Sequence, residues 1–129
     1  MEMDFAKGDG LVPAIVQDAQ TGDVLMLGFM NREALAETRR SGLATFYSRA
    51  RRKLWKKGES SGHTLRVREM RIDCDADALL LRVDPAGPGV CHEGYRTCFF
   101  RRWDTGGEAL VVEERAFDPV AVYGKGKGS

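Results

Sequence analysis

Residues 71–84, "RIDCDADALLLRVD", combine a cluster of charge with an apolar run that resembles a strand. Three aspartates stand at every second position with a cysteine among them: Asp73, Asp75 and Asp77, with Cys74. The apolar residues that follow predict a buried strand over residues 78–84, which the Pro/Gly-rich residues 85–89 end. Because like charges packed together repel each other, we expect a cation, most obviously a metal ion, to offset them.

The rest of the chain predicts further strands and one helix. Residues 11–30 indicate two strands around a turn at 19–23. Asn31 suits an N-cap and Gly42 a C-terminal cap, so residues 31–41 form the one clear helix. Further strands are expected over 43–48, 63–73, 97–103 and 109–114, with a loop over 54–63 and a bulge where Val67 and Met70 break the alternation. The fold class that follows is mainly β (α+β): a small, barrel-like mixed sheet with one helix.

Length and composition fit one domain. The chain has 129 residues, of which 43% are apolar, and a net charge of +1. We therefore expect a single domain over 1–129, with its core in 11–115 and a flexible tail at 122–129. The charge argues against nucleic acid as a partner, and no apolar run approaches the roughly 18 residues of a membrane span. The N-terminus lacks the features of a signal peptide and the cysteines are odd in number, so we expect a cytoplasmic protein without a disulfide framework.

The cysteines are spaced C-x16-C-x6-C, at Cys74, Cys91 and Cys98. Free cysteines are often small core residues, so three unrelated buried thiols are one interpretation. Cys91 and Cys98, however, share a short loop with Gly94. Cys74 lies beside carboxylates, and the whole pattern is typical of thiolate ligation of zinc. Three protein ligands leave a position open for water, as in catalytic zinc sites, whereas His92 as a fourth ligand would close the site.

The aspartates predict a second metal site of a different kind. On an extended segment the three carboxylates point to one face and Cys74 to the other. Oxygen ligands suit magnesium, while the sulfur suits zinc. The alternative interpretation is a solvated turn. A calcium-binding EF-hand loop is excluded, because its sixth and twelfth positions would be Ala78 and Asp84 in place of glycine and glutamate.

The basic block 49–57, "RARRKLWKK", leads into a loop rich in glycine and serine that ends at His63. Cations, hydroxyls and backbone N–H groups in this combination bind phosphates. The candidate phosphate contacts are Arg49, Arg51, Arg52, Lys53, Lys56, Lys57, Ser60 and Ser61. Two other interpretations are open: a solvated basic loop, and a single-stranded RNA surface on which Phe46, Tyr47 and Trp55 stack bases. A P-loop is excluded, because the pattern G-x-x-x-x-G-K-[ST] is absent.

Four segments together carry a family resemblance. They are "DVLMLGFMN", "FYSRARRKLWKKGESSGH", "RIDCDADALLLRVD" and "CHEGYRTCFF". In this order they strongly resemble the phosphoribosyl-AMP cyclohydrolase family of histidine biosynthesis, over residues 11–102. Gly28, Ala50 and Leu65 depart from the alanine, serine and glutamine that are common in the family at these positions.

The resemblance implies an activity, its metals and an assembly. Water is added at C6 of phosphoribosyl-AMP, and the adenine ring opens between N1 and C6 to give the formimino-aminoimidazole carboxamide ribonucleotide. The implied ligands are Cys74, Cys91 and Cys98 for zinc, with one ion per subunit, and Asp73, Asp75 and Asp77 for magnesium. The implied assembly is an intertwined homodimer that acts on a small nucleotide.

Two further expectations concern proton transfer and the shared site. His92 is the candidate for proton transfer, with His63 as the alternative. Because Cys74 starts a buried strand and the other two cysteines follow a Pro/Gly turn, we expect each zinc to take Cys74 from one subunit and two thiolates from its partner. The competing functions are a zinc-dependent nucleotide deaminase, whose H-x-E and C-x-x-C motifs are absent, and a zinc-stabilised RNA-binding module.

Overall fold

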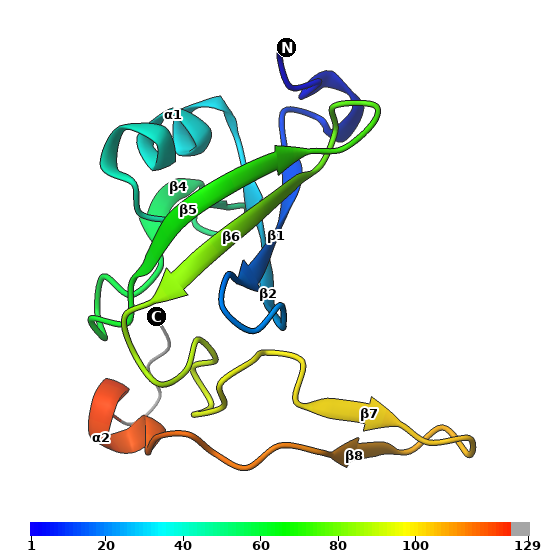
Figure 1. Cartoon of the computed structure of the whole chain (residues 1–129), viewed down its shortest axis with the longest axis vertical. Coiled ribbons are helices and arrows are strands. Elements are labelled where there is room, and N and C mark those ends of the chain that lie inside the picture. The colour runs from blue at the N-terminus through cyan, green and yellow to red at the C-terminus, as the bar shows by residue number, and fades with distance from the viewer. Residues whose placement is uncertain (125–129) are drawn as a thin grey trace.

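A four-stranded mixed sheet forms the centre of the molecule. The computed structural model describes residues 1–124, and residues 125–129 lie outside this part. The sheet contains β1 (Val12–Asp18), β2 (Val24–Met30), β5 (Leu65–Ile72) and β6 (Leu79–Pro85), in the spatial order β2-β1-β6-β5. β1 and β6 run parallel, while each pairs antiparallel with its other neighbour (Figure 1).

The sheet is open, so the expected barrel-like closure is wrong, whereas the mainly β, mixed-sheet class is confirmed. β2 and β5 are the two edges of the four-stranded sheet. Beyond β5, pairing continues only as an isolated bridge between Leu43 and Arg66, and among the described residues it does not return to β2.

The core follows from the alternation of the two central strands. In β1 the side chains of Val12, Ala14 and Val16 are fully buried, and the intervening residues are more exposed. In β6 the pattern repeats, with Leu79, Leu81 and Val83 buried on the same side. Because β1 and β6 pair in register, their buried side chains lie side by side on one face of the sheet. This face forms the apolar core and determines which side chains point inward.

The predicted helix and bulge are confirmed. Helix α1 (Arg32–Ser41) begins where the Asn31 side chain accepts a hydrogen bond from the Ala34 N–H at 2.8 Å. It ends at Gly42, whose φ of 77° is the left-handed conformation that glycine adopts readily. In β5 the register shifts between Val67 and Glu69, so one extra residue forms the bulge that the broken alternation predicts.

The segment expected as a loop over 54–63 begins as a strand. β3 (Thr45–Ser48) pairs antiparallel with β4 (Lys53–Lys56), and the loop proper follows β4. Polar composition suggested a loop, but Trp55 packs against the buried Phe46 ring with centroids 5.1 Å apart. This aromatic pair supports the strand pairing, which local composition did not reveal.

The C-terminal part differs from the sequence expectation. β7 (Arg101–Trp103) and β8 (Ala109–Val111) form an exposed hairpin that extends away from the sheet, and both are shorter than the expected strands (Figure 1). A second helix, α2 (Pro119–Tyr123), follows an N-cap at Asp118. Val122 and Tyr123, at the start of the expected flexible tail, lie in this helix, where the Tyr123 side chain is buried and Gly124 is the C-cap. Residues 125–129 of that tail lie outside the described residues. Among the described residues, no helix has the length and apolarity needed to cross a membrane.

Candidate functional site

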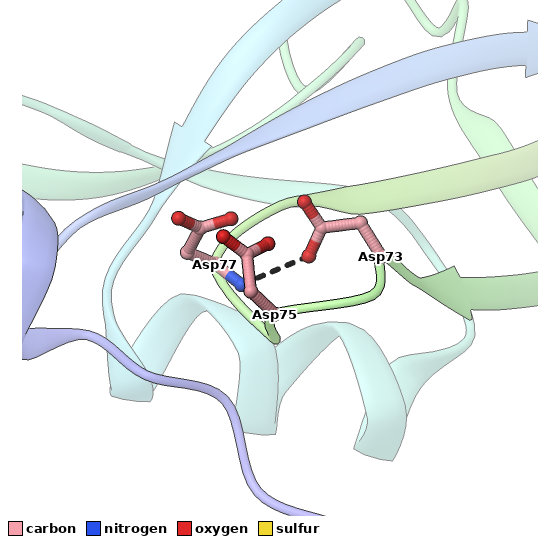
Figure 2. Close-up of side chains that lie close together, drawn as sticks. All are labelled: Asp73, Asp75 and Asp77. Carbon is pink, nitrogen blue, oxygen red and sulfur yellow. Dashed lines mark hydrogen bonds between the residues drawn. The ribbon is translucent and has the colours of Figure 1, made fainter.

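The three aspartates converge at the turn between β5 and β6. One oxygen of each carboxylate lies within 4.8 Å of the others, a spacing that could hold one metal ion (Figure 2). Asp73 Oδ1 accepts hydrogen bonds from the Asp77 N–H at 2.9 Å and from the Ala78 N–H at 3.1 Å, which folds the turn. Ala76 has a φ of 61°, so the segment is curled rather than extended. The expected alternation along an extended strand is therefore wrong, and the turn itself gathers the carboxylates.

A lysine already faces this cluster. Lys7 Nζ lies 3.3 Å from Asp75 Oδ2 and 3.6 Å from Asp77 Oδ2. A hydrogen bond between these two carboxyls raises the pKa of Asp77 and lowers the pKa of Asp75, which Lys7 lowers further. Lys7 therefore supplies part of the positive charge that the sequence predicts next to the aspartates.

Cys91 and Cys98 lie together on a tight loop. The Val90 N–H donates to Arg96 O at 3.2 Å, and the Cys91 N–H donates to Tyr95 O at 3.1 Å. Gly94 closes this loop at a φ of 98°, and a Cβ there would lie 2.5 Å from Phe117 O. The cysteine loop, residues 90–98, therefore folds back on itself and brings Cys91 and Cys98 near each other.

The Cys98 thiol is affected both by burial and by its neighbour Cys91. Burial of the sulfur and then the neighbouring Cys91 thiol raise the pKa of Cys98 to about 11, although the Cys98 residue as a whole stays exposed. A thiol with such a pKa is protonated at neutral pH, so a thiolate here requires a cation beside it. Cys91 itself is buried.

Cys74 lies far from this pair within one chain. It stands in the turn before β6, whereas Cys91 comes after the end of that strand (Figure 1). A strand as long as Leu79–Pro85 spans about 20 Å at roughly 3.3 Å per residue. In the part of the chain that the structure describes, only the aspartates form a set of three potential ligands around one point.

The two histidines differ in how firmly they are held. His63 Nδ1 lies 3.2 Å from Gly89 O, and because a carbonyl only accepts, Nδ1 carries the hydrogen and Nε2 remains to receive a proton. The His63 ring meets the Phe117 ring edge-on at 5.0 Å, and a Cβ at Gly87 would lie 2.3 Å from it. His92, next to Cys91, is exposed. The sequence favoured His92, while the structure fixes the orientation of His63.

The basic block divides into an exposed part and one buried residue. Arg49, Arg51, Arg52 and Lys53 are exposed and Lys56 is half-buried, while Ser60 is exposed and Ser61 half-buried. Lys57 is only 5% exposed. Burial lowers the pKa of Lys57, and the nearby Cys98, Tyr123 and Cys91 oppose this effect. The Lys57 ammonium thus faces the cysteine loop, which no local signal in the sequence predicted.

Comparison with known proteins identifies a family for this chain. The family model described as phosphoribosyl-AMP cyclohydrolase matches residues 26–100. A protein of that name from Solibacter usitatus is 59% identical over 124 residues, covering 96% of this chain and 98% of its own. The chain belongs to the phosphoribosyl-AMP cyclohydrolase family. A relative of the same name from Desulforapulum autotrophicum is 53% identical, over 95% of this chain and 98% of its own. Another, from Methanococcoides burtonii, is 55% identical, over 90% of this chain and 92% of its own.

Membership of the phosphoribosyl-AMP cyclohydrolase family confirms the resemblance read from the four segments. The matched span contains both histidines, all three cysteines and all three aspartates. It ends at residue 100, so the exposed hairpin of β7 and β8 and helix α2 lie outside it. The candidate site is therefore built from the part of the chain that defines the family.

Proposed function

We propose that this chain hydrolyses phosphoribosyl-AMP by opening its adenine ring between N1 and C6, a step of histidine biosynthesis. The observation that carries the proposal is the family match over residues 26–100, which includes every candidate metal ligand and both histidines. The unpaired cysteines suit a reducing compartment, so we assign the reaction to the cytoplasm.

The donor atoms of the cysteine loop fit zinc. Two neighbouring thiols, one of them with its pKa raised to about 11, are stabilised as thiolates when a soft cation binds between them. Zinc held by thiolates supplies a Lewis acid that makes water reactive near neutral pH. Lys57 brings a positive charge to the side of this pair, which offsets the excess negative charge of a three-thiolate site.

The third thiolate is proposed to be Cys74 of a second subunit. About 20 Å of β6 separates Cys74 from the pair within one chain, at roughly 3.3 Å per residue. The exposed hairpin supports an intertwined homodimer, because Phe99, Trp103 and Val111 are 55%, 80% and 56% exposed. Apolar surface of this extent on an isolated hairpin is typical of an interface. Each dimer would then hold two zinc ions, one per subunit.

The aspartates are proposed to hold magnesium. Their oxygens lie within 4.8 Å of one another at a surface turn, and carboxylates are the oxygen ligands that magnesium prefers. Lys7 lies against Asp75 and Asp77, so it has to move aside when the ion binds. The same ion could hold a phosphate of the substrate.

The remaining side chains orient the substrate and move protons. We assign proton transfer to His92, which accepts a proton from the attacking water and returns it to N1 as the C6–N1 bond breaks. His63 is the alternative, since its fixed Nδ1 hydrogen bond leaves Nε2 ready to accept. The basic residues of the block 49–57, with Ser60 and Ser61, are proposed to bind the two phosphates of the substrate.

The test is incubation of the zinc-loaded protein with phosphoribosyl-AMP while ring opening is followed by ultraviolet absorbance. Turnover by the wild-type chain and its loss in Cys98→Ser are expected. Asp77→Asn is the matched variant, because it removes one oxygen ligand and should retain zinc while weakening the dependence on magnesium. A wild-type protein that binds zinc and magnesium but leaves the absorbance unchanged would refute the proposed activity.

A further inference from the structure

Arg96 connects the cysteine loop to the turn between β1 and β2. Its Nη2 atom donates to Asp18 Oδ2 at 2.7 Å and to Thr21 Oγ1 at 3.0 Å. Its Nη1 atom donates to Asp23 Oδ2 at 2.8 Å. Three side chains of one turn therefore accept from a single guanidinium, whose planar fork fits several acceptors at once.

The acceptors of Arg96 are themselves held in place. Asp18 is the last residue of β1 and is 7% exposed. Its Oδ1 atom accepts from the Gln20 N–H at 2.8 Å, and its own N–H donates to Asp23 O at 2.8 Å. Arg96 is thus bound to a rigid turn at the end of a central strand.

Hydrogen bonds on both sides of Arg96 hold the segments that contain the two cysteines. Arg96 O accepts from the Val90 N–H, next to Cys91. On the other side, Thr97 Oγ1 donates to Val24 O at 2.9 Å, and the Cys98 N–H donates to Leu25 O at 2.7 Å. Arg96 lies between these two attachments, so its position decides how the loop meets the sheet.

We propose that Arg96 is a positioning residue of the zinc site, which fixes the spacing and direction of the Cys91 and Cys98 thiols before the metal binds. The proposal rests on the zinc ligation proposed above. A loop that is already ordered spends less free energy on ordering when it binds its ligand. Residues that orient metal ligands typically change metal affinity by about 10–100-fold when removed. Arg96 touches no metal ligand with its side chain, and acts through the loop.

A general effect on stability is the competing explanation, and Arg82 offers a matched control. Arg82 donates to Glu69 Oε1 at 3.2 Å and to Ala19 O, in the same turn, at 3.1 Å. Its side chain is 31% exposed and that of Arg96 is 34% exposed. Arg82 belongs to β6, and among the described residues its side chain bonds to Glu69 and Ala19 and not to the cysteine loop. Both arginines hold the turn, but only Arg96 links it to the thiols.

The experiment measures cobalt affinity of the full-length protein through the thiolate-to-cobalt charge-transfer absorption, which oxygen ligands alone do not produce. Arg96→Ala should weaken cobalt binding by about 10–100-fold and Arg96→Lys by less. Arg82→Ala should bind cobalt as the wild type does, even where its metal-free melting temperature falls as far as that of Arg96→Ala. Thr21→Val serves as the test if Arg96→Ala does not fold. It removes only one of the three side-chain acceptors of Arg96, so it should weaken cobalt binding less than the loss of the guanidinium would.

The outcomes separate the two proposals. Equal cobalt affinity in the wild type, Arg96→Ala and Thr21→Val overturns the positioning role and leaves the zinc ligation intact. Weakened binding in Arg82→Ala equal to that in Arg96→Ala also overturns it, because the effect is then one of stability. A wild-type protein without any thiolate-to-cobalt absorption refutes the zinc ligation, and the positioning role with it.

Discussion

Mixing two inactive variants should restore activity if the zinc site is shared between subunits. Cys74→Ser removes the thiol at one end of β6, and Cys98→Ser removes a thiol beyond the other end. Two sulfurs on one zinc ion lie about 4 Å apart, since each Zn–S bond is about 2.3 Å. The roughly 20 Å length of β6 is about five times that distance, which is why we propose that the third thiolate comes from a second chain.

The size of the recovered activity follows from the two-fold symmetry. When equal amounts of the two variants are refolded together, about half of the dimers are mixed if chains assort randomly. In a mixed dimer, one site lacks both of the substituted thiols, those of Cys74 and Cys98, and the other site has all three cysteines. About a quarter of wild-type activity should therefore return, while each variant alone stays inactive.

The assay is steady-state ring opening after the subunits are refolded together, with mixed dimers quantified by mass spectrometry. The control is each variant refolded alone by the same procedure. Mixed dimers that are present in the expected amount and are still inactive would refute the shared site.

Three further predictions concern single residues. Gly28→Ala should lower the free energy of unfolding by about 1–3 kcal/mol in a denaturant titration, because the new Cβ would lie 2.5 Å from the buried Phe46 ring; unchanged stability would show that the ring moves freely. His92→Ala should retain zinc and lose about 10²–10⁴ in turnover, whereas loss of zinc together with activity would make His92 a ligand. Burial raises the pKa of Asp18, but hydrogen bonds from Gln20 and Arg96 outweigh it, and the pKa is held below its ordinary value. The stability that Asp18 contributes is therefore present above an unfolded pKa of about 3.9 and is lost as pH falls through the lower folded pKa. The difference in unfolding free energy between wild type and Asp18→Asn should be largest near neutral pH and shrink in acid, and a difference independent of pH would contradict this.

Local signals predicted most of the fold. Caps at Asn31 and Gly42 set the helix, and the turn at 19–23 separates the first two strands, because each signal depends on residues close in sequence. The strand pairing of Trp55 with Phe46 was missed, since a contact between strands leaves no periodic pattern in a polar segment. Closure of the sheet was also misjudged, because periodicity does not say which edges pair.

For the aspartate cluster, the sequence predicted which residues come together but not how they do so. The aspartates do converge, but through a curled turn with Ala76 at positive φ, which a pattern of alternate residues does not reveal. The burial of Lys57 next to the cysteine loop, and the fork of Arg96 on the turn after β1, join segments far apart in the chain. Such contacts arise only when the fold brings the segments together, so no local motif predicts them.

The product of the reaction tests the central claim most directly. The purified protein, loaded with zinc and magnesium, is incubated with phosphoribosyl-AMP, and the product is analysed by mass spectrometry while ammonia is measured in parallel. Ring opening adds one water to the substrate and releases no ammonia, which is the result we predict. Release of one ammonia for each substrate consumed, with the purine ring intact, would identify a deaminase and contradict the account.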